Sequence, residues 1–252
     1  MAPVDTRTTF DTLSLPWGRL AYERVGRSGP CLIFLHGTGC DNRDWDSVRT
    51  HLPTDGFRCI FLEFRGHGNS SVSKTPFTLE DLADDALALL DHLGISQAHW
   101  VGHSLGGMVS LAAARKSKAA AGLVLLEGWT SLKAAAAFAP GRFYGRLDAD
   151  AITRIKTKAA ATIARHNPDQ WRAFWSSVEA FDGSDVLADP GMPIREVYGA
   201  LGRLPETQAR LLVPEHPRIT WQWLPDCGHY LSLEKPAEIA AGLVSAISPA
   251  QR

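Results

Sequence analysis

One heptapeptide, V-G-H-S-L-G-G at residues 101–107, places a serine between glycines two positions to either side. It follows a short apolar run and precedes an alanine-rich stretch that favours a helix. A serine at such a sharp strand-to-helix turn presents its hydroxyl at the tip, at a helix N-terminus that favours developing negative charge. The spacing G-x-S-x-G therefore predicts that Ser104 is a nucleophile, although ordinary glycine-rich loops also produce this pattern by chance.

A serine hydroxyl becomes a useful nucleophile only when a base removes its proton. His229, in the sequence D-C-G-H-Y, is the candidate base because imidazole titrates near neutral pH. Its loop follows the last predicted strand, at the sheet edge where Ser104 is also expected. Among the other eight histidines, we expect His36 and His67 to shape loop backbone, and His103 to point away from Ser104.

The elements that position these residues are typical of an α/β protein. Continuous apolar runs indicate strands buried on both faces, and amphipathic stretches between them indicate helices. Their alternation predicts a mostly parallel eight-stranded sheet with helices on both faces and an antiparallel hairpin at one edge. The predicted strands are 8–15, 19–25, 31–35, 57–62, 98–101, 123–126, 194–198 and 219–224; the predicted helices include 44–52, 78–93, 108–115, 205–213 and 236–247.

The alternation breaks between residues 129 and 189, where only helical patterns occur, at 150–165 and from Pro168 onward. We therefore predict a helical cap, residues 129–189, inserted into a core domain of residues 1–128 and 190–252. The aromatic residues of the cap could line an apolar substrate pocket above Ser104, or could simply pack the cap on itself and on the sheet. The candidates for substrate binding are Trp129, Phe143, Trp171 and Trp175.

No basic residue of the cap is clearly positioned to bind the carboxylate of a substrate. We expect them to face solvent, and the pocket to accept an apolar group rather than a charged metabolite. These residues are Arg142, Arg146, Arg154 and Lys156.

Composition limits the classes of partner. The 252 residues are 45% hydrophobic and 21% charged, with a net charge of −1 and no long basic run, which argues against nucleic acid or an anionic membrane as partner. The first residues contain no apolar signal-peptide core, and no run approaches the ~18 apolar residues of a membrane span. The four cysteines form no C-x-x-C pair. We expect a reduced, cytoplasmic protein, monomeric or homodimeric, without metal or cofactor.

Four segments, in the expected order, resemble the motifs of the α/β-hydrolase superfamily, and the resemblance covers nearly the whole chain outside the cap. They are an H-G oxyanion loop at 36–39, an R-G-x-G-x-S loop at 65–70, the nucleophile elbow at 102–106, and a late histidine loop in which 228–229 is followed by E-K-P at 234–236. The same resemblance implies an oxyanion hole made by the backbone N–H groups of Thr38 and Leu105.

The third member of the expected triad departs from the usual pattern. The acid of the superfamily usually follows the strand after the cap, but that slot holds Gly202, and the nearest carboxylate there is Glu206. A minority of the superfamily carries the acid at the end of the preceding strand, where this chain has Glu127. We predict that Glu127 orients His229; a structural ion pair with a loop arginine is the alternative role. The next candidate acids are Asp226, then Asp185 and Asp189.

The resemblance implies a cofactor-independent serine hydrolase that cleaves a carboxylic ester or lactone of a medium-sized apolar substrate through an acyl-enzyme. A serine at position 104 excludes the alkyl-enzyme route of epoxide hydrolases and haloalkane dehalogenases, which use an aspartate nucleophile. Two alternatives stay open: a lyase, acyltransferase or carbon–carbon bond hydrolase with the same triad, and a non-catalytic ligand receptor with this fold.

Overall fold

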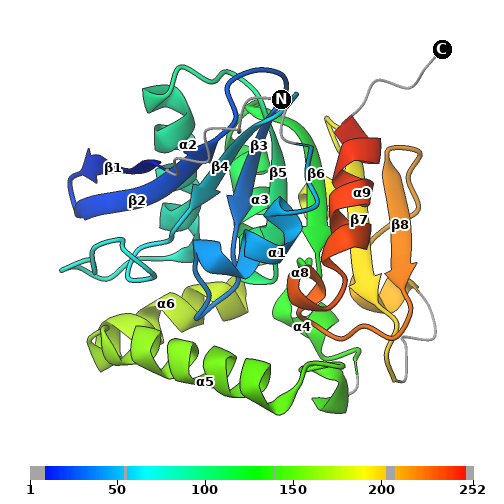
Figure 1. The fold of residues 1–252 in the computed structure, drawn as a ribbon. Helices are drawn as coiled ribbons and strands as arrows, with labels where there is room; N and C mark the ends of the chain where they lie inside the picture. Colours follow the sequence, from blue (N-terminus) through cyan, green and yellow to red (C-terminus); the bar gives the residue numbers. More distant parts are fainter. Residues whose placement is uncertain (1–8, 54–55, 139, 203–207, 248–252) are drawn as a thin grey trace.

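The computed structural model describes the chain except residues 1–8, 54–55, 139, 203–207 and 248–252. Its strands form one sheet in the order β1-β2-β4-β3-β5-β6-β7-β8, in which β1 and β2 pair antiparallel and β3 to β8 pair parallel (Figure 1). This architecture confirms the predicted fold class. The strands are β1 (Thr9–Leu15), β2 (Gly18–Val25), β3 (Cys31–Leu35), β4 (Arg58–Leu62), β5 (Ala98–His103), β6 (Ala120–Leu126), β7 (Ile194–Gly199) and β8 (Ile219–Leu224).

Helices cover both faces of the sheet, and the cap crosses one end of it. In Figure 1, α1 and α9 lie in front of the sheet, α2 and α3 behind it, and α5 and α6 run below the end toward which β3 points. The helices are η1 (Asn42–Trp45), α1 (Asp46–Arg49), α2 (Leu79–His92), α3 (Leu105–Lys116), α4 (Leu132–Ala135), η2 (Pro140–Arg142), α5 (Ala149–Ala164), α6 (Pro168–Ala180), α7 (Ser184–Ala188), η3 (Gln208–Leu211), α8 (Leu231–Glu234) and α9 (Pro236–Ile247), where η marks a 3₁₀ helix.

The alternation of side chains along each central strand divides the core into two layers. On β3, Ile33 and Leu35 belong to the layer with α2 and α3, whereas Leu32 and Phe34 belong to the layer with α9. Both sets are fully buried, which explains why β3 reads as an uninterrupted apolar run. The sheet thereby fixes the loops at its carboxyl edge, where the candidate residues lie.

Local sequence signals explain most helix boundaries. Thr78 caps α2 through a reciprocal capping box with Asp81, and Asn167 caps α6 with Pro168 at its first position. Two expected helices differ from the structure. Residues 44–52 form the end of a 3₁₀ helix and a four-residue α-helix, and of 205–213 only Gln208–Leu211 form a 3₁₀ helix, with 203–207 outside the described residues.

Candidate active site

The turn at Ser104 is strained, and close backbone packing holds it in place. Ser104 joins β5 to α3 with φ 53° and ψ −116°, in the left-handed half of backbone space that non-glycine residues seldom adopt. A Cβ on Gly106 would lie 2.1 Å from the Leu35 carbonyl oxygen, and one on Gly102 would lie 2.4 Å from the Gly106 oxygen. The two glycines of the motif are thus needed for β5, β3 and α3 to meet at this turn.

The loop after β3 lies directly against the elbow. A Cβ on Gly37 would come within 3.0 Å of His103 Nδ1 and 3.3 Å of Ser104 Cβ. Thr38 follows and lines the same cavity as Ser104 and Leu105. Within the described part of the chain, the backbone N–H groups of Thr38 and Leu105 donate to no protein acceptor, so both are available to an oxyanion.

Glu127 and His229 meet beneath this turn. Glu127 follows β6, is fully buried, and adopts φ 50°. The Nδ1 atom of His229 lies 3.3 Å from Glu127 Oε2. With the proton on Nδ1, the imidazole keeps a lone pair on Nε2, the form that a general base requires. The rings of Trp129 and Phe143 lie nearly parallel to this imidazole, with centroids 5.7 and 4.7 Å away, and limit its rotation.

Arg142 contradicts the expectation that the basic residues of the cap face solvent. Arg146, Arg154 and Lys156 are exposed, but Arg142 is buried. Its guanidinium binds both carboxylate oxygens of Glu127, with 3.0 Å between Nη1 and Oε2. The neighbouring charge explains the difference, because a buried carboxylate needs a partner. Glu127 therefore makes both of the contacts weighed from the sequence: it lies against His229 and forms an ion pair with a loop arginine.

His103 lines the cavity, and its ring is directed toward the loop of His229. Its Nε2 is 2.9 Å from the carbonyl oxygen of His229, and the two ring centroids are 4.8 Å apart. Burial, assisted by the neighbouring His229, lowers the pKa of His103 to about 3, so it is neutral at physiological pH. His36 bridges two loops: Nδ1 bonds the Gly37 oxygen at 2.8 Å, and Nε2 accepts from the Phe64 N–H.

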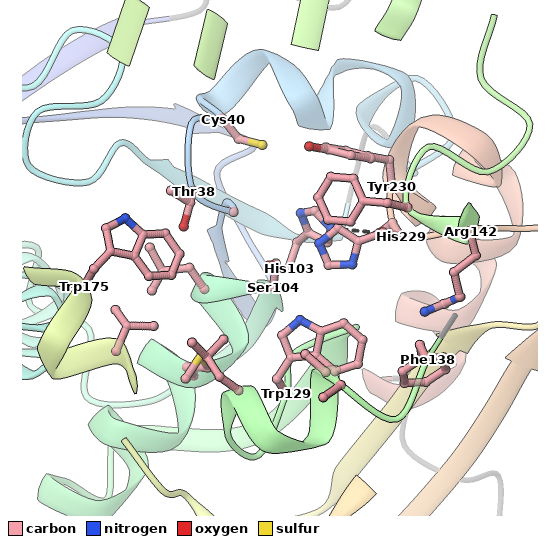
Figure 2. A pocket seen from close by; sticks show the side chains of 18 residues that line it. Thr38, Cys40, His103, Ser104, Trp129, Phe138, Arg142, Trp175, His229 and Tyr230 are labelled. Carbon is pink, nitrogen blue, oxygen red and sulfur yellow. Dashed lines mark hydrogen bonds between the residues drawn. The ribbon is translucent and has the colours of Figure 1, made fainter. Parts of the chain in front are cut away.

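A cavity of about 660 Å³ opens above Ser104. Figure 2 shows Ser104 and His229 near its middle, with Trp175 on one side and Arg142 on the other. Most of its wall is apolar and comes from the cap and α3, through Met108, Leu132, Ala135, Ala136, Trp175 and Val178. A cavity of this size and lining suits a medium-sized apolar group.

Of the four cap aromatics proposed for substrate binding, Trp129, Phe143 and Trp175 line this cavity. The expectation for Trp171 is wrong. Its ring packs on His166 at 4.8 Å and on Phe174 at 5.4 Å, between the cap and the core. Trp171 and Trp175 are one helical turn apart, yet Trp171 lies over the loop that carries His67, 6.4 Å from that ring.

With this geometry in place, comparison with known proteins identifies the family. A family model described as alpha/beta hydrolase fold matches residues 30–169, more than half of the chain. The chain belongs to the α/β-hydrolase family.

Curated relatives of this α/β-hydrolase match over parts of their length. A 3-oxoadipate enol-lactonase from Acinetobacter baylyi is 29% identical over 161 residues, which are 64% of this chain and 48% of the relative. An acetyltransferase component of the acetoin cleaving system from Pseudomonas putida is 42% identical over 96 residues, 37% of this chain and 26% of the relative. The chain thus spans between about a quarter and a half of the length of these two relatives.

Solved structures of low sequence identity share the fold over nearly the whole chain. A mutant of the N-acyl homoserine lactonase AidH, complexed with N-hexanoyl homoserine, is 18% identical, with a TM-score of 0.77 over 97% of this chain and 99% of its own. The enol-lactonase from Burkholderia xenovorans is 20% identical, with a TM-score of 0.71 over 95% and 100%. At these identities the likeness establishes the fold alone.

The other candidate acids of this α/β-hydrolase lie apart from His229. Asp226 is exposed and pairs with Arg146 at 3.3 Å, and Asp185 pairs with Arg115. Asp189 is also exposed, and Glu206 lies outside the described residues. Within the described chain, Glu127 is the carboxylate in hydrogen-bond contact with His229.

Among the described residues, no three His, Cys, Asp or Glu side chains form a cluster that could hold a metal ion. In the same part of the chain, no helix has the length and apolar character needed to cross a membrane. The four cysteines are buried and unpaired, and burial raises the pKa of the Cys31 thiol to about 11, so it stays protonated at neutral pH.

Proposed function

We propose that this α/β-hydrolase is a serine hydrolase of carboxylic esters or lactones with a medium-sized apolar acyl part. The observation that carries the proposal is the contact of His229 with Glu127 below a cavity that Ser104 and His229 both line. A histidine side chain held in place by a hydrogen-bonded carboxylate is the arrangement that activates a serine hydroxyl. Relatives named esterase and enol-lactonase support the same class of reaction.

The reaction follows from the positions of these groups. His229 takes the proton of Ser104 as the hydroxyl oxygen attacks the substrate carbonyl, and Glu127 stabilises the imidazolium that forms. The N–H groups of Thr38 and Leu105 donate to the oxyanion of the tetrahedral intermediate. The imidazolium then protonates the leaving alcohol, and the acyl-enzyme forms. His229 then deprotonates a water molecule as that water attacks the acyl carbonyl. The imidazolium returns the proton to Ser104 Oγ as the acyl–oxygen bond breaks, and the acid is released.

We place the acyl part of the substrate in the apolar portion of the cavity, which Met108, Leu132 and Val178 line. Burying additional methylene groups there lowers the free energy of the bound substrate by about 0.8 kcal/mol each. We therefore expect p-nitrophenyl butyrate and hexanoate to be hydrolysed with a higher kcat/KM than the acetate. A marked preference for the acetate would contradict the proposed substrate class.

The decisive variant is Ser104→Ala, assayed with p-nitrophenyl butyrate. We expect kcat/KM to fall at least ~10³-fold, because no other group can form the acyl-enzyme. Ser117→Ala, at the other end of α3, is the matched control and keeps the wild-type rate. Equal turnover in wild type and Ser104→Ala would overturn the proposal.

A further inference from the structure

A residue of the cap contacts the proposed triad acid, although it belongs to a different part of the chain. Arg142 ends η2, and both its terminal nitrogens donate to Glu127, one to each carboxylate oxygen. Its Nη2 also donates to the carbonyl oxygen of Gly199 at 3.0 Å. The guanidinium lies over the ring of Phe138, 4.0 Å from its centroid. The arginine is thus held from three sides at the end of β7.

These contacts determine which way the carboxylate of Glu127 points. Oε1 accepts from Arg142 and from the Gly199 N–H at 2.9 Å, and Oε2 accepts from Arg142 and lies against His229 Nδ1. A bidentate guanidinium fixes the plane of a carboxylate as well as its position. Without Arg142, Glu127 would have one backbone donor left to hold it, and a fully buried carboxylate would lose its counter-charge.

We propose that Arg142 is a positioning residue of the triad, because it orients the Glu127 carboxylate toward His229. The triad is then complete only when the cap, which carries Arg142, is packed against the sheet. This inference rests on the proposed function only in that the triad is taken to be catalytic. Arg142 does not contact the reacting atoms of the substrate. It affects catalysis by fixing Glu127, which in turn orients His229.

Arg142 also supplies the positive charge that lies against the Glu127–His229 pair. Other titratable groups face this pair: His103 from β5, Tyr198 from β7, and Cys227 from the loop before His229. Burial keeps the pKa of His103 far below neutrality and those of Tyr198 and Cys227 far above, so all three are neutral.

A fourth group, Glu234 of α8, lies on the far side of this loop. It accepts from the backbone N–H groups of Gly228 and Arg146, not from His229. Arg142 is therefore the cation in contact with the pair within the described chain. Removing its positive charge leaves the buried carboxylate of Glu127 without a cation in contact.

The first test compares Arg142→Met and Arg142→Lys with Arg146→Met. Arg146 lies four residues away and is exposed. Among the residues that the structure describes, its side chain pairs only with the exposed Asp226, so it is a matched control. With p-nitrophenyl butyrate, Arg142→Met is expected to lower kcat by about 100-fold with KM within threefold, as a misplaced catalytic group does. Arg142→Lys should recover part of the loss, and Arg146→Met should keep the wild-type kcat. A rise in KM at unchanged kcat would make Arg142 a substrate contact and overturn the proposal.

A double-mutant cycle tests whether Arg142 acts through Glu127. In a Glu127→Gln background, Arg142→Met should cost less than threefold further, because the partner through which it acts is already gone. Multiplicative losses would contradict the proposal. Thermal melting of each variant separates these effects from loss of the fold.

A second readout does not depend on turnover. The ring C–H signals of His229 are recorded by NMR and assigned by their loss in His229→Gln. In Arg142→Met these signals should shift and broaden relative to wild type and Arg146→Met, because the carboxylate that holds the ring is no longer fixed in one orientation. If Arg142→Met does not fold, Arg142→Gln removes the same charge. Unchanged His229 signals would overturn the inference even if the ester is hydrolysed, and shifted signals support it even if Ser104→Ala leaves the ester activity intact.

Discussion

Two glutamates lie buried on adjoining strands of the sheet, in opposite surroundings. Glu127 follows β6 and is 0% exposed; Glu196 lies within β7 and is 1% exposed. Glu127 accepts from a guanidinium and a backbone N–H, and contacts an imidazole. Glu196 Oε2 has no hydrogen-bond donor among the described residues. Burial raises the pKa of Glu196 to about 8, and the nearby Tyr198 hydroxyl offsets this only in part.

This difference shows that burial alone does not determine whether a carboxyl group is charged. Both side chains have lost contact with water, but only Glu127 has a donor at each carboxylate oxygen, whereas Glu196 Oε2 has none among the described residues. A carboxyl without donors is more stable as the neutral acid, whereas one that faces Arg142 and His229 is useful as an anion. At neutral pH, Glu196 is thus mostly protonated and forms part of the apolar layer around Tyr198 and Trp221.

The largest expected effect is on kcat, when each of the two glutamates is replaced by glutamine. Glu127→Gln removes the charge that stabilises the imidazolium of His229, and kcat should fall by ~10³–10⁴-fold, as when the acid of a comparable triad is replaced. Glu196→Gln makes the same chemical change in a buried glutamate of the next strand. It should leave kcat within threefold. Equal losses in the two variants would mean that burial, not contact with His229, explains the effect of position 127.

The two glutamates also show what could be predicted from the sequence. Glu127 was recognisable because it ends an uninterrupted apolar run, where a charged residue needs a partner. The same runs located the strands, since a strand buried on both faces carries its signal in its own residues. Glu196 lies inside a predicted strand and gave no signal of its own. Its charge state is set by burial in the folded sheet and by Tyr198, two residues along the same strand.

Arg142 was missed for a related reason. The stretch between α4 and α5 has no periodicity, and the burial of an arginine there depends on a carboxylate 15 residues away and on the closing of the cap over the sheet edge. Trp171 was misplaced because helical spacing alone does not say which of two neighbouring side chains faces a cavity. The elbow and His229 loops were located from local motifs, whereas these two contacts are tertiary. The boundaries of the cap at 129 and 189 stay a prediction.

A smaller effect concerns stability and its dependence on pH. The pKa of Glu196 is higher in the folded protein than its ordinary value of 4.5, so its contribution is fully present below about pH 4.5 and is lost as pH rises toward 8. Glu196→Gln cannot ionise. The variant should therefore gain about 4 kcal/mol in unfolding free energy relative to wild type as the pH rises from 5 to 9.

Urea denaturation of both proteins at several pH values measures this difference. Burial also raises the pKa values of Glu63, Asp85 and Glu234. These groups are present in both proteins, so their contributions cancel in the comparison. A difference that stays constant from pH 5 to pH 9 would show that Glu196 has the same charge in the folded and unfolded chains, and the contrast with Glu127 would disappear.

The smallest effect tests what Tyr198 does for Glu196. Its hydroxyl is buried and makes no well-aligned hydrogen bond within the described chain, so Tyr198→Phe should change the unfolding free energy at pH 5 by less than ~1 kcal/mol. The hydroxyl does lower the pKa of Glu196, and without it the loss of stability with rising pH should continue above pH 8. The shift should vanish in a Glu196→Gln background. If Tyr198→Phe instead cost more than ~2 kcal/mol at pH 5, the hydroxyl would be a full partner of Glu196. Glu196 would then resemble Glu127 in having a donor, and the absence of a cation, rather than of donors, would be what keeps it neutral.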